Sequence, residues 1–90
     1  MRIDKYLKLS RLVKRRTVAQ EMADVGAIRI NGKVCKPASE VKEGDTVEIA
    51  YPRKILAVKV LTGDETAIKR KAEAYIAESE REIDPDTKPW

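Results

Sequence analysis

A tight β-hairpin is predicted by the sequence Gly26-Ala27-Ile28-Arg29-Ile30-Asn31-Gly32-Lys33-Val34-Cys35. The pair Asn31-Gly32 is the one best suited to the positive φ angles of a type I′ turn, and branched apolar residues flank it on both sides. Turn chemistry accounts for both residues, so neither is assigned to a ligand. Gly26 precedes the hairpin, and glycine readily takes the left-handed conformation that closes a helix.

Two helices are expected before Gly26. Over residues 2–13 apolar side chains recur near helical spacing and basic side chains fall mostly between them, although Ser10 favours an interruption or an early end. Thr17 with Gln20 three residues later matches a capping box, in which the hydroxyl and the amide satisfy free backbone groups at a helix start. A second helix is therefore predicted to begin at Thr17 and to run for about two turns.

Downstream of the hairpin, the pattern predicts strands and then a third helix. Strands are expected over residues 46–51 and 54–61, which are rich in branched apolar residues. Residues 65–82 are expected to be helical because their apolar side chains share one narrow face, and the tail 84–90 is expected to be disordered. The predicted fold class is α+β: two N-terminal helices packed on a small, mainly antiparallel sheet, plus a C-terminal helix.

Composition indicates one small domain and excludes several classes of enzyme. The chain has 90 residues, of which 42% are hydrophobic, and it contains no Phe, so its core must be small and mainly aliphatic. His is absent and Cys35 is the only cysteine, which excludes an internal disulfide, Cys/His metal cages and nucleophile pairs that need a histidine. Cys35 is interpreted as a small strand residue. We expect neither catalysis nor a metal or cofactor.

The charge of the chain is polarised along its length. Residues 1–36 contain ten Lys or Arg and three acids, a net charge of +7, whereas residues 37–90 contain nine bases and twelve acids, a net charge of −3. The N-terminal part is therefore expected to contact a polyanion. No apolar run approaches the roughly 20 residues that a membrane-spanning helix needs, so we expect a cytoplasmic protein with no membrane partner.

A phosphate-binding surface is predicted where the second helix begins. Lys14-Arg15-Arg16-Thr17 lies there, and the free backbone N–H groups of a helix start add to the side-chain charges. Arg2, Lys5 and Lys8 on the first helix extend this surface, and Lys33 and Lys36 at the hairpin supply a second edge. Since aromatic residues are not interleaved with these bases, recognition is expected to depend on the shape and the phosphates of the polyanion and to be strongly salt-sensitive.

Four sequence blocks strongly resemble the RNA-binding domain of ribosomal protein S-four. They are Arg2-Ile3-Asp4-Lys5-Tyr6-Leu7, Lys14-Arg15-Arg16-Thr17 with Ala19, Gly26 to Lys33 with its hairpin, and Val41-Lys42 with Gly44-Asp45. The resemblance spans roughly the first 51 residues, and the agreement of four blocks in order with the helix and turn signals makes it specific. It implies an alpha-L RNA-binding fold that recognises folded RNA. The domain organisation it implies is an S-four-type domain at 1–62, the C-terminal helix at 63–83 and the tail at 84–90.

Among members of this family, the chain looks most like the short stand-alone factors of ribosome-associated quality control. That resemblance implies a ribosome-associated protein that binds large subunits obstructed by peptidyl-tRNA, contacts both rRNA and tRNA, and supports C-terminal tailing of stalled chains. It also implies a partner protein that delivers alanyl-tRNA, and a monomer off the ribosome. By position in the motif, the principal RNA contacts would be Arg2 and Arg16, assisted by Lys5, Arg11, Lys14 and Arg15.

Three alternatives remain open from the sequence. The chain also resembles the related small ribosome-associated heat-shock protein, a general rRNA-binding or subunit-recycling factor, but its acidic C-terminal residues depart from the basic extension typical of that group. A DNA-binding regulator is a second alternative, although the second helix offers mainly Gln20 and Glu21 for reading bases. The third is an interaction module whose third helix recruits a protein.

Overall fold

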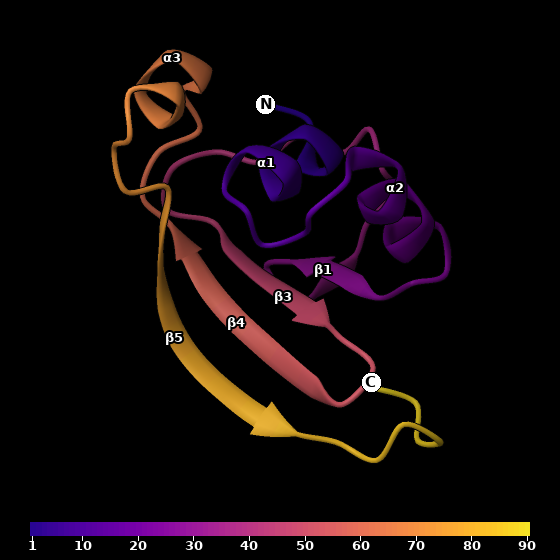
Figure 1. Cartoon of the computed structure of the whole chain (residues 1–90). Coiled ribbons are helices and arrows are strands. Elements are labelled where there is room, and N and C mark those ends of the chain that lie inside the picture. Colours follow the sequence, from indigo (N-terminus) through magenta and orange to yellow (C-terminus); the bar gives the residue numbers. More distant parts are fainter.

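The computed structural model describes residues 1–90, which form three short helices and one antiparallel sheet (Figure 1). The elements along the chain are α1 (Ile3–Leu9), α2 (Arg16–Asp24), β1 (Ile28–Ile30), β2 (Lys33–Val34), β3 (Thr46–Ala50), β4 (Lys54–Val60), α3 (Glu65–Lys69) and β5 (Tyr75–Glu82). The strand order across the sheet is β2-β1-β3-β4-β5, and every neighbouring pair is antiparallel. The predicted α+β class with two helices on a small antiparallel sheet is confirmed.

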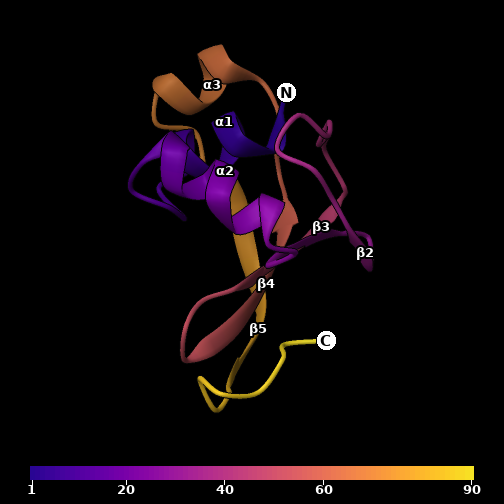
Figure 2. The same ribbon diagram turned by 90° about the vertical axis from the view of Figure 1, so that its right-hand side faces the viewer.

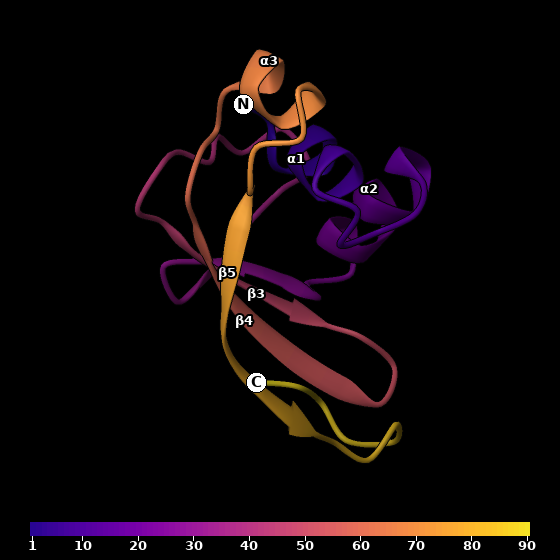
Figure 3. The ribbon, with the colours of Figure 1, turned by 60° about the vertical axis from the view of Figure 1, so that its left-hand side comes forward.

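The helices α1 and α2 cover one face of the sheet at the β1–β3 side, and α3 lies next to α1 at one end (Figures 1 and 2). Between these layers lies an aliphatic core, in which Tyr6 is the largest fully buried side chain. The β4–β5 ribbon extends beyond the helices, which makes the molecule elongated, about 38 × 23 × 21 Å (Figure 3). None of the helices is long and apolar enough to cross a membrane.

The predicted hairpin is confirmed. Asn31 and Gly32 have φ angles of 50° and 82°, as a type I′ turn requires, and Ile30 pairs with Lys33 across it. The Asn31 amide also joins the turn to β3: its nitrogen donates to Asp45 Oδ1 at 3.0 Å, and its oxygen accepts the Thr46 N–H at 2.9 Å. Asn31 therefore fixes the hairpin against the sheet in addition to forming the turn.

Each helix ends with a residue in the left-handed conformation, one position after its C-cap. This residue is Gly26 after α2, as predicted, but it is Arg11 after α1 and Lys71 after α3, with φ angles of 80°, 66° and 69°. In all three cases its backbone N–H donates to the carbonyl three residues earlier, at 3.0–3.1 Å. The same helix ending is thus built once with glycine and twice with a long cation.

The capping box predicted at Thr17 is wrong. Helix α2 begins one residue earlier, at Arg16, with Arg15 as an N-cap that makes no side-chain hydrogen bond. Gln20 does not bond back to the helix start, because its side-chain nitrogen donates to Asp4 on α1 instead, at 2.9 Å. Helix α1 ends at Leu9 with Ser10 as its C-cap, which is the early end that Ser10 favoured.

The predicted C-terminal helix at 63–83 is wrong beyond its first turns. Helix α3 covers only Glu65–Lys69, and Tyr75–Glu82 forms β5, which pairs with β4 from Val60↔Tyr75 to Lys54↔Glu82 with one register shift between Ala57 and Val58. The side chain of Asp64 caps α3 by accepting the Thr66 N–H at 3.0 Å. Pairing with β4 provides hydrogen-bond partners for the backbone of this segment, which forms a strand although its side chains favour a helix.

The tail 84–90, predicted to be disordered, turns back onto the body of the domain (Figure 1). Trp90 Nε1 donates to the Gly26 carbonyl at 3.0 Å, and the Arg29 guanidinium lies 4.8 Å from the centre of the indole ring. Both contacts are compatible with a half-buried aromatic ring that has a polar edge to satisfy. The tail and the end of the sheet near Ala50 and Tyr51 thereby line a common pocket.

Candidate nucleic-acid interface

A buried carboxylate organises the basic surface at the start of α1. The side chain of Asp4 is fully buried, yet its oxygens contact two arginines that remain exposed. Arg2 donates from Nε to Oδ1 at 3.2 Å and from Nη2 to Oδ2 at 3.1 Å, and Arg16 Nη2 donates to Oδ1 at 3.4 Å. The amide of Gln20 and the backbone N–H of Lys5 complete the shell, at 2.9 and 2.8 Å. We call Asp4, Arg2, Arg16 and Gln20 the Asp4 clamp.

The backbone places Arg2 independently of its side chain. The segment before α1 pairs with the loop that follows β2: the Ile3 N–H donates to the Ser39 carbonyl at 2.7 Å, and the Val41 N–H to the Met1 carbonyl at 2.8 Å. The Met1 ammonium adds an ion pair with Glu40 at 2.9 Å. Two rigid supports, this pairing and the start of α2, therefore bring the two guanidinium groups of the clamp to one carboxylate.

The clamp keeps its carboxylate ionised. Burial raises the pKa of Asp4, but hydrogen bonds from Gln20, Arg16 and the Lys5 backbone outweigh it and hold the pKa below its usual value of 3.8. The guanidinium groups are about half exposed, with 46% of the Arg2 and 42% of the Arg16 side chain accessible. Each arginine thus has one side fixed on Asp4 and another open to a ligand.

The start of α2 adds positive potential next to the clamp. No side chain caps this helix, and no acidic residue lies in its first turn, so its first backbone N–H groups and the positive end of its dipole stay available. Lys14 and Arg15 precede it and are exposed without an ion pair, and Thr17 is exposed in its first turn. This arrangement fits an anion, and in particular a phosphate.

Lys5 is a further predicted site residue whose charge is paired within the protein. Its ammonium forms an ion pair with Glu65, at the start of α3, and Glu65 also faces Lys69 at 3.6 Å. The hydrogen bond from Lys5 lowers the pKa of Glu65. Arg2, Lys5 and Arg16 line one shallow depression with Gly63 and Glu65, so Lys5 borders the clamp with its charge largely compensated.

The remaining predicted bases lie away from the clamp. Lys8 and Arg11 lie at the far end of α1, where they line a groove with the segment between α3 and β5. Lys33 in β2 and Lys36 beyond it are exposed at the β2 edge of the sheet, opposite β5. The structure therefore brings Arg2 and Arg16 into direct proximity and distributes the other bases over the surrounding surface.

Sequence reasoning missed Asp4 and Gln20 as parts of the site. The available signal was the position of Asp4, which lies beside Ile3 and three residues before Leu7 on the apolar face of α1. A carboxylate on a buried helix face requires partners, because an isolated buried charge is costly. Two arginines and a glutamine on neighbouring elements meet that requirement.

The fold and this surface define the chain as an S4-type RNA-binding domain protein: residues 1–47 match the family model described as "S4 domain". Two of the most similar curated proteins are each named "RQC P-site tRNA stabilizing factor". The protein from Streptococcus pneumoniae is 50% identical over 72 residues, which are 80% of this chain and 82% of the relative. That from Listeria innocua is 47% identical over 85 residues, covering 93% of this chain and 92% of the relative.

The chain belongs to the family of RQC P-site tRNA stabilizing factors, and within the wider S4-domain family its role is RNA binding in ribosome-associated quality control. The fold is shared with a solved structure, the trimeric Vibrio cholerae Heat Shock Protein 15, with a TM-score of 0.71, 20% identity and coverage of 88% of this chain and 82% of that one. The predicted resemblance to the S-four domain is thus confirmed.

Proposed function

We propose that this chain binds obstructed large ribosomal subunits that carry peptidyl-tRNA, contacts both rRNA and the tRNA, and so supports C-terminal tailing of the stalled chain. The Asp4 clamp is the observation that carries this proposal, since it presents two fixed, half-exposed guanidinium groups beside an uncapped helix start. The relatives' shared name, which refers to a P-site tRNA, supports the choice of RNA.

In this proposal the protein works without chemistry of its own. It acts in the cytoplasm on the ribosome, as a monomer when free, together with a partner protein that delivers alanyl-tRNA. Arg2 and Arg16 are the principal RNA contacts, and Lys14, Arg15 and Thr17 extend the contact along the start of α2. Guanidinium groups held in a fixed orientation lose less side-chain freedom on binding than free ones, which favours affinity for a structured phosphate backbone.

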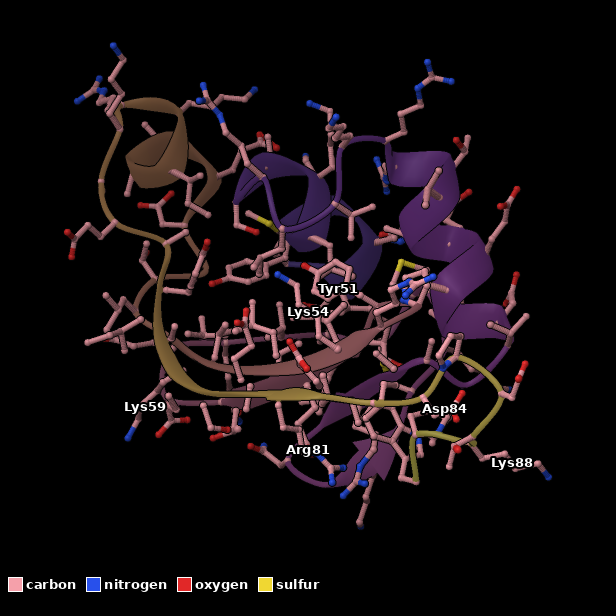
Figure 4. The ribbon with its side chains drawn as sticks, turned by 60° about the horizontal axis from the view of Figure 1, so that its bottom comes forward. Tyr51, Lys54, Lys59, Arg81, Asp84 and Lys88 are labelled. Carbon is pink, nitrogen blue, oxygen red and sulfur yellow. The ribbon has the colours of Figure 1, made fainter.

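The test is cosedimentation with isolated large subunits, with and without bound peptidyl-tRNA. We expect the wild type to prefer the tRNA-bearing particle, and Arg16→Ala to weaken binding by about ten-fold or more, because it removes charge-assisted hydrogen bonds. Lys59→Ala, which removes one exposed charge from the sheet (Figure 4), should bind as the wild type does.

The variant Asp4→Asn distinguishes binding by oriented arginines from non-specific attraction between the positively charged protein and RNA. This variant raises the net positive charge of the protein, so non-specific attraction to RNA alone would make binding tighter. Loss of the anchor that orients Arg2 and Arg16 would instead make it weaker, and that is the expected result. The proposal would be overturned if folded wild-type protein bound to large subunits neither with nor without peptidyl-tRNA. Binding to free duplex DNA would then be measured.

A further inference from the structure

A second basic surface lies at the opposite end of α1 from the Asp4 clamp. The groove there is bounded on one wall by Lys8 and Arg11 and on the other by Lys69 and Lys71, and it encloses about 950 Å³. Helix α1 is seven residues, roughly 10 Å, long, so the groove is close to the clamp yet separate from it. The ion pair between Lys5 of α1 and Glu65 of α3 lies on the side of the clamp and not in the groove.

The groove carries an excess of uncompensated positive charge. Lys8, Arg11 and Lys71 are exposed and form no ion pair, Lys69 has only its 3.6 Å contact with Glu65, and Glu73 is the one acidic residue of the lining. Like charges gathered from two walls repel each other, so this arrangement costs free energy in the unbound protein. A bound polyanion would remove that cost.

The backbone at both walls supports a role in binding. Arg11 and Lys71 occupy the left-handed positions that end α1 and α3, whereas the matching position after α2, outside the groove, is Gly26. Glycine takes this conformation without the steric penalty that a side chain meets. The protein therefore holds two long cations in an unfavourable backbone conformation, and both of them line the same groove. Strain of this kind occurs preferentially at ligand sites.

We propose that this groove binds a second stretch of RNA phosphate backbone, so that the clamp and the groove hold two segments of RNA on either side of α1. This proposal deepens the proposed function and depends on it. An extended polyanion fits better than a small anion, because the cations are spread along an open groove and no buried donor converges on one point. Figure 3 shows that α3 and the following segment lie beside α1, and these two parts of the chain carry the residues that line the groove.

The double variant Arg11→Gly/Lys71→Gly tests the proposal, because it removes two cations and relieves the backbone strain together. We expect the melting temperature to rise by a few degrees, while binding to tRNA-bearing large subunits weakens about ten-fold at physiological salt. The slope of log K against log salt should become shallower by about 2, one unit for each phosphate that is no longer neutralised. If the variant is more stable and yet binds less well, the loss of binding comes from a weakened RNA interface and not from a damaged fold.

The matched control is Lys59→Ala/Lys88→Ala, which removes the same charge from exposed positions that point outward, away from the helices (Figure 4). It should leave both affinity and slope at wild-type values. If the glycine variant binds with the wild-type slope, the groove does not contact RNA, and an acidic segment of a protein becomes the alternative ligand. Failure of this proposal can be distinguished from failure of the proposed function, because in the second case the wild-type protein itself does not bind the tRNA-bearing large subunit.

Discussion

Asp4 is buried and ionised, so its contribution to stability depends on pH. Its pKa in the folded protein lies below the usual 3.8, which means that the ionised form stabilises the fold above about that pH and that this stabilisation is lost as the pH falls through the folded pKa. Asp4→Asn should therefore lower the free energy of unfolding by about 2 kcal/mol at neutral pH. Urea denaturation at a series of pH values measures this difference.

The pH series supplies its own control. As the pH falls through the folded pKa of Asp4, which lies below its usual 3.8, the wild-type carboxyl becomes protonated, so the stabilities of the two proteins should converge. Other carboxylates titrate equally in both proteins and cancel in the difference. A gap that stays constant down to the acid limit would mean that the missing contribution is packing and not charge.

At the scale of single residues, the exposed bases of the site could be predicted from the sequence, but Asp4, the buried carboxylate that holds two of them in place, could not. Charge and motif position identify Arg2 and Arg16, because a cation on a helix surface needs no knowledge of its neighbours. Asp4 acquires its role only when α2 brings Arg16 and Gln20 against α1, a contact that no local pattern encodes. Gln20 was assigned to a cap for the same reason: its local and tertiary partners compete.

At the scale of elements, β5 shows where local preference fails. Tyr75–Glu82 contains three Glu, one Arg and one Ala, which favour helices over strands, and its apolar residues fit a helical face together with Ile68 and Ala72. It becomes a strand because the edge of β4 would otherwise leave a row of unpaired backbone groups beside the core. The hairpin and strands β3 and β4 were predictable because turn chemistry, branched residues and tertiary pairing agree there.

The importance of β5 also changes how the C-terminal part can be tested. Removing residues 65–90 would take away Ile68 and Ala74 from the core, and it would also remove β5, one of the two strands that pair with β4. The truncated chain would lose stability through the fold, whatever its effect on binding. Point variants such as those in the groove are therefore the informative changes.

Tyr51 connects the sheet to the segment between the two N-terminal helices. Its hydroxyl donates to the Leu12 carbonyl at 2.6 Å, and Figure 4 shows the ring pointing from the sheet toward the helices. Burial raises the pKa of this hydroxyl. Tyr51→Phe leaves the carbonyl without its donor and should lower the free energy of unfolding by about 1 kcal/mol, seen as a fall of roughly 4–8 °C in the melting temperature. No change would mean that water replaces the donor.

At the scale of the whole molecule, the uneven distribution of charge along the sequence becomes an uneven distribution of charge over the surface. The bases at the two ends of α1 and at the start of α2 form the Asp4 clamp and one wall of the groove, and Lys69 and Lys71 add to the other wall from the otherwise acidic C-terminal part. Strand β5, with Glu78, Glu80 and Glu82, forms the far edge of the sheet. Such a charge distribution turns the basic side toward RNA during approach.

Binding to large subunits should accordingly depend steeply on salt. If about five phosphates are neutralised, affinity should fall by roughly two to three orders of magnitude between about 50 and 200 mM salt. Titrations at four or more salt concentrations give the slope. Affinity that barely changes with salt would indicate that apolar or protein contacts dominate, and would count against the basic surface as the main interface.

The docked end of the chain has an optical consequence. Trp90 is the only tryptophan, and its indole is half-buried between Gly26 and Arg29, so its emission reports on this one contact. Release of the tail would move the ring into water and shift its fluorescence to longer wavelength, whereas circular dichroism would still register intact helices and sheet. The molecule therefore contains a native fluorophore that distinguishes local detachment of the tail from global unfolding without any added label.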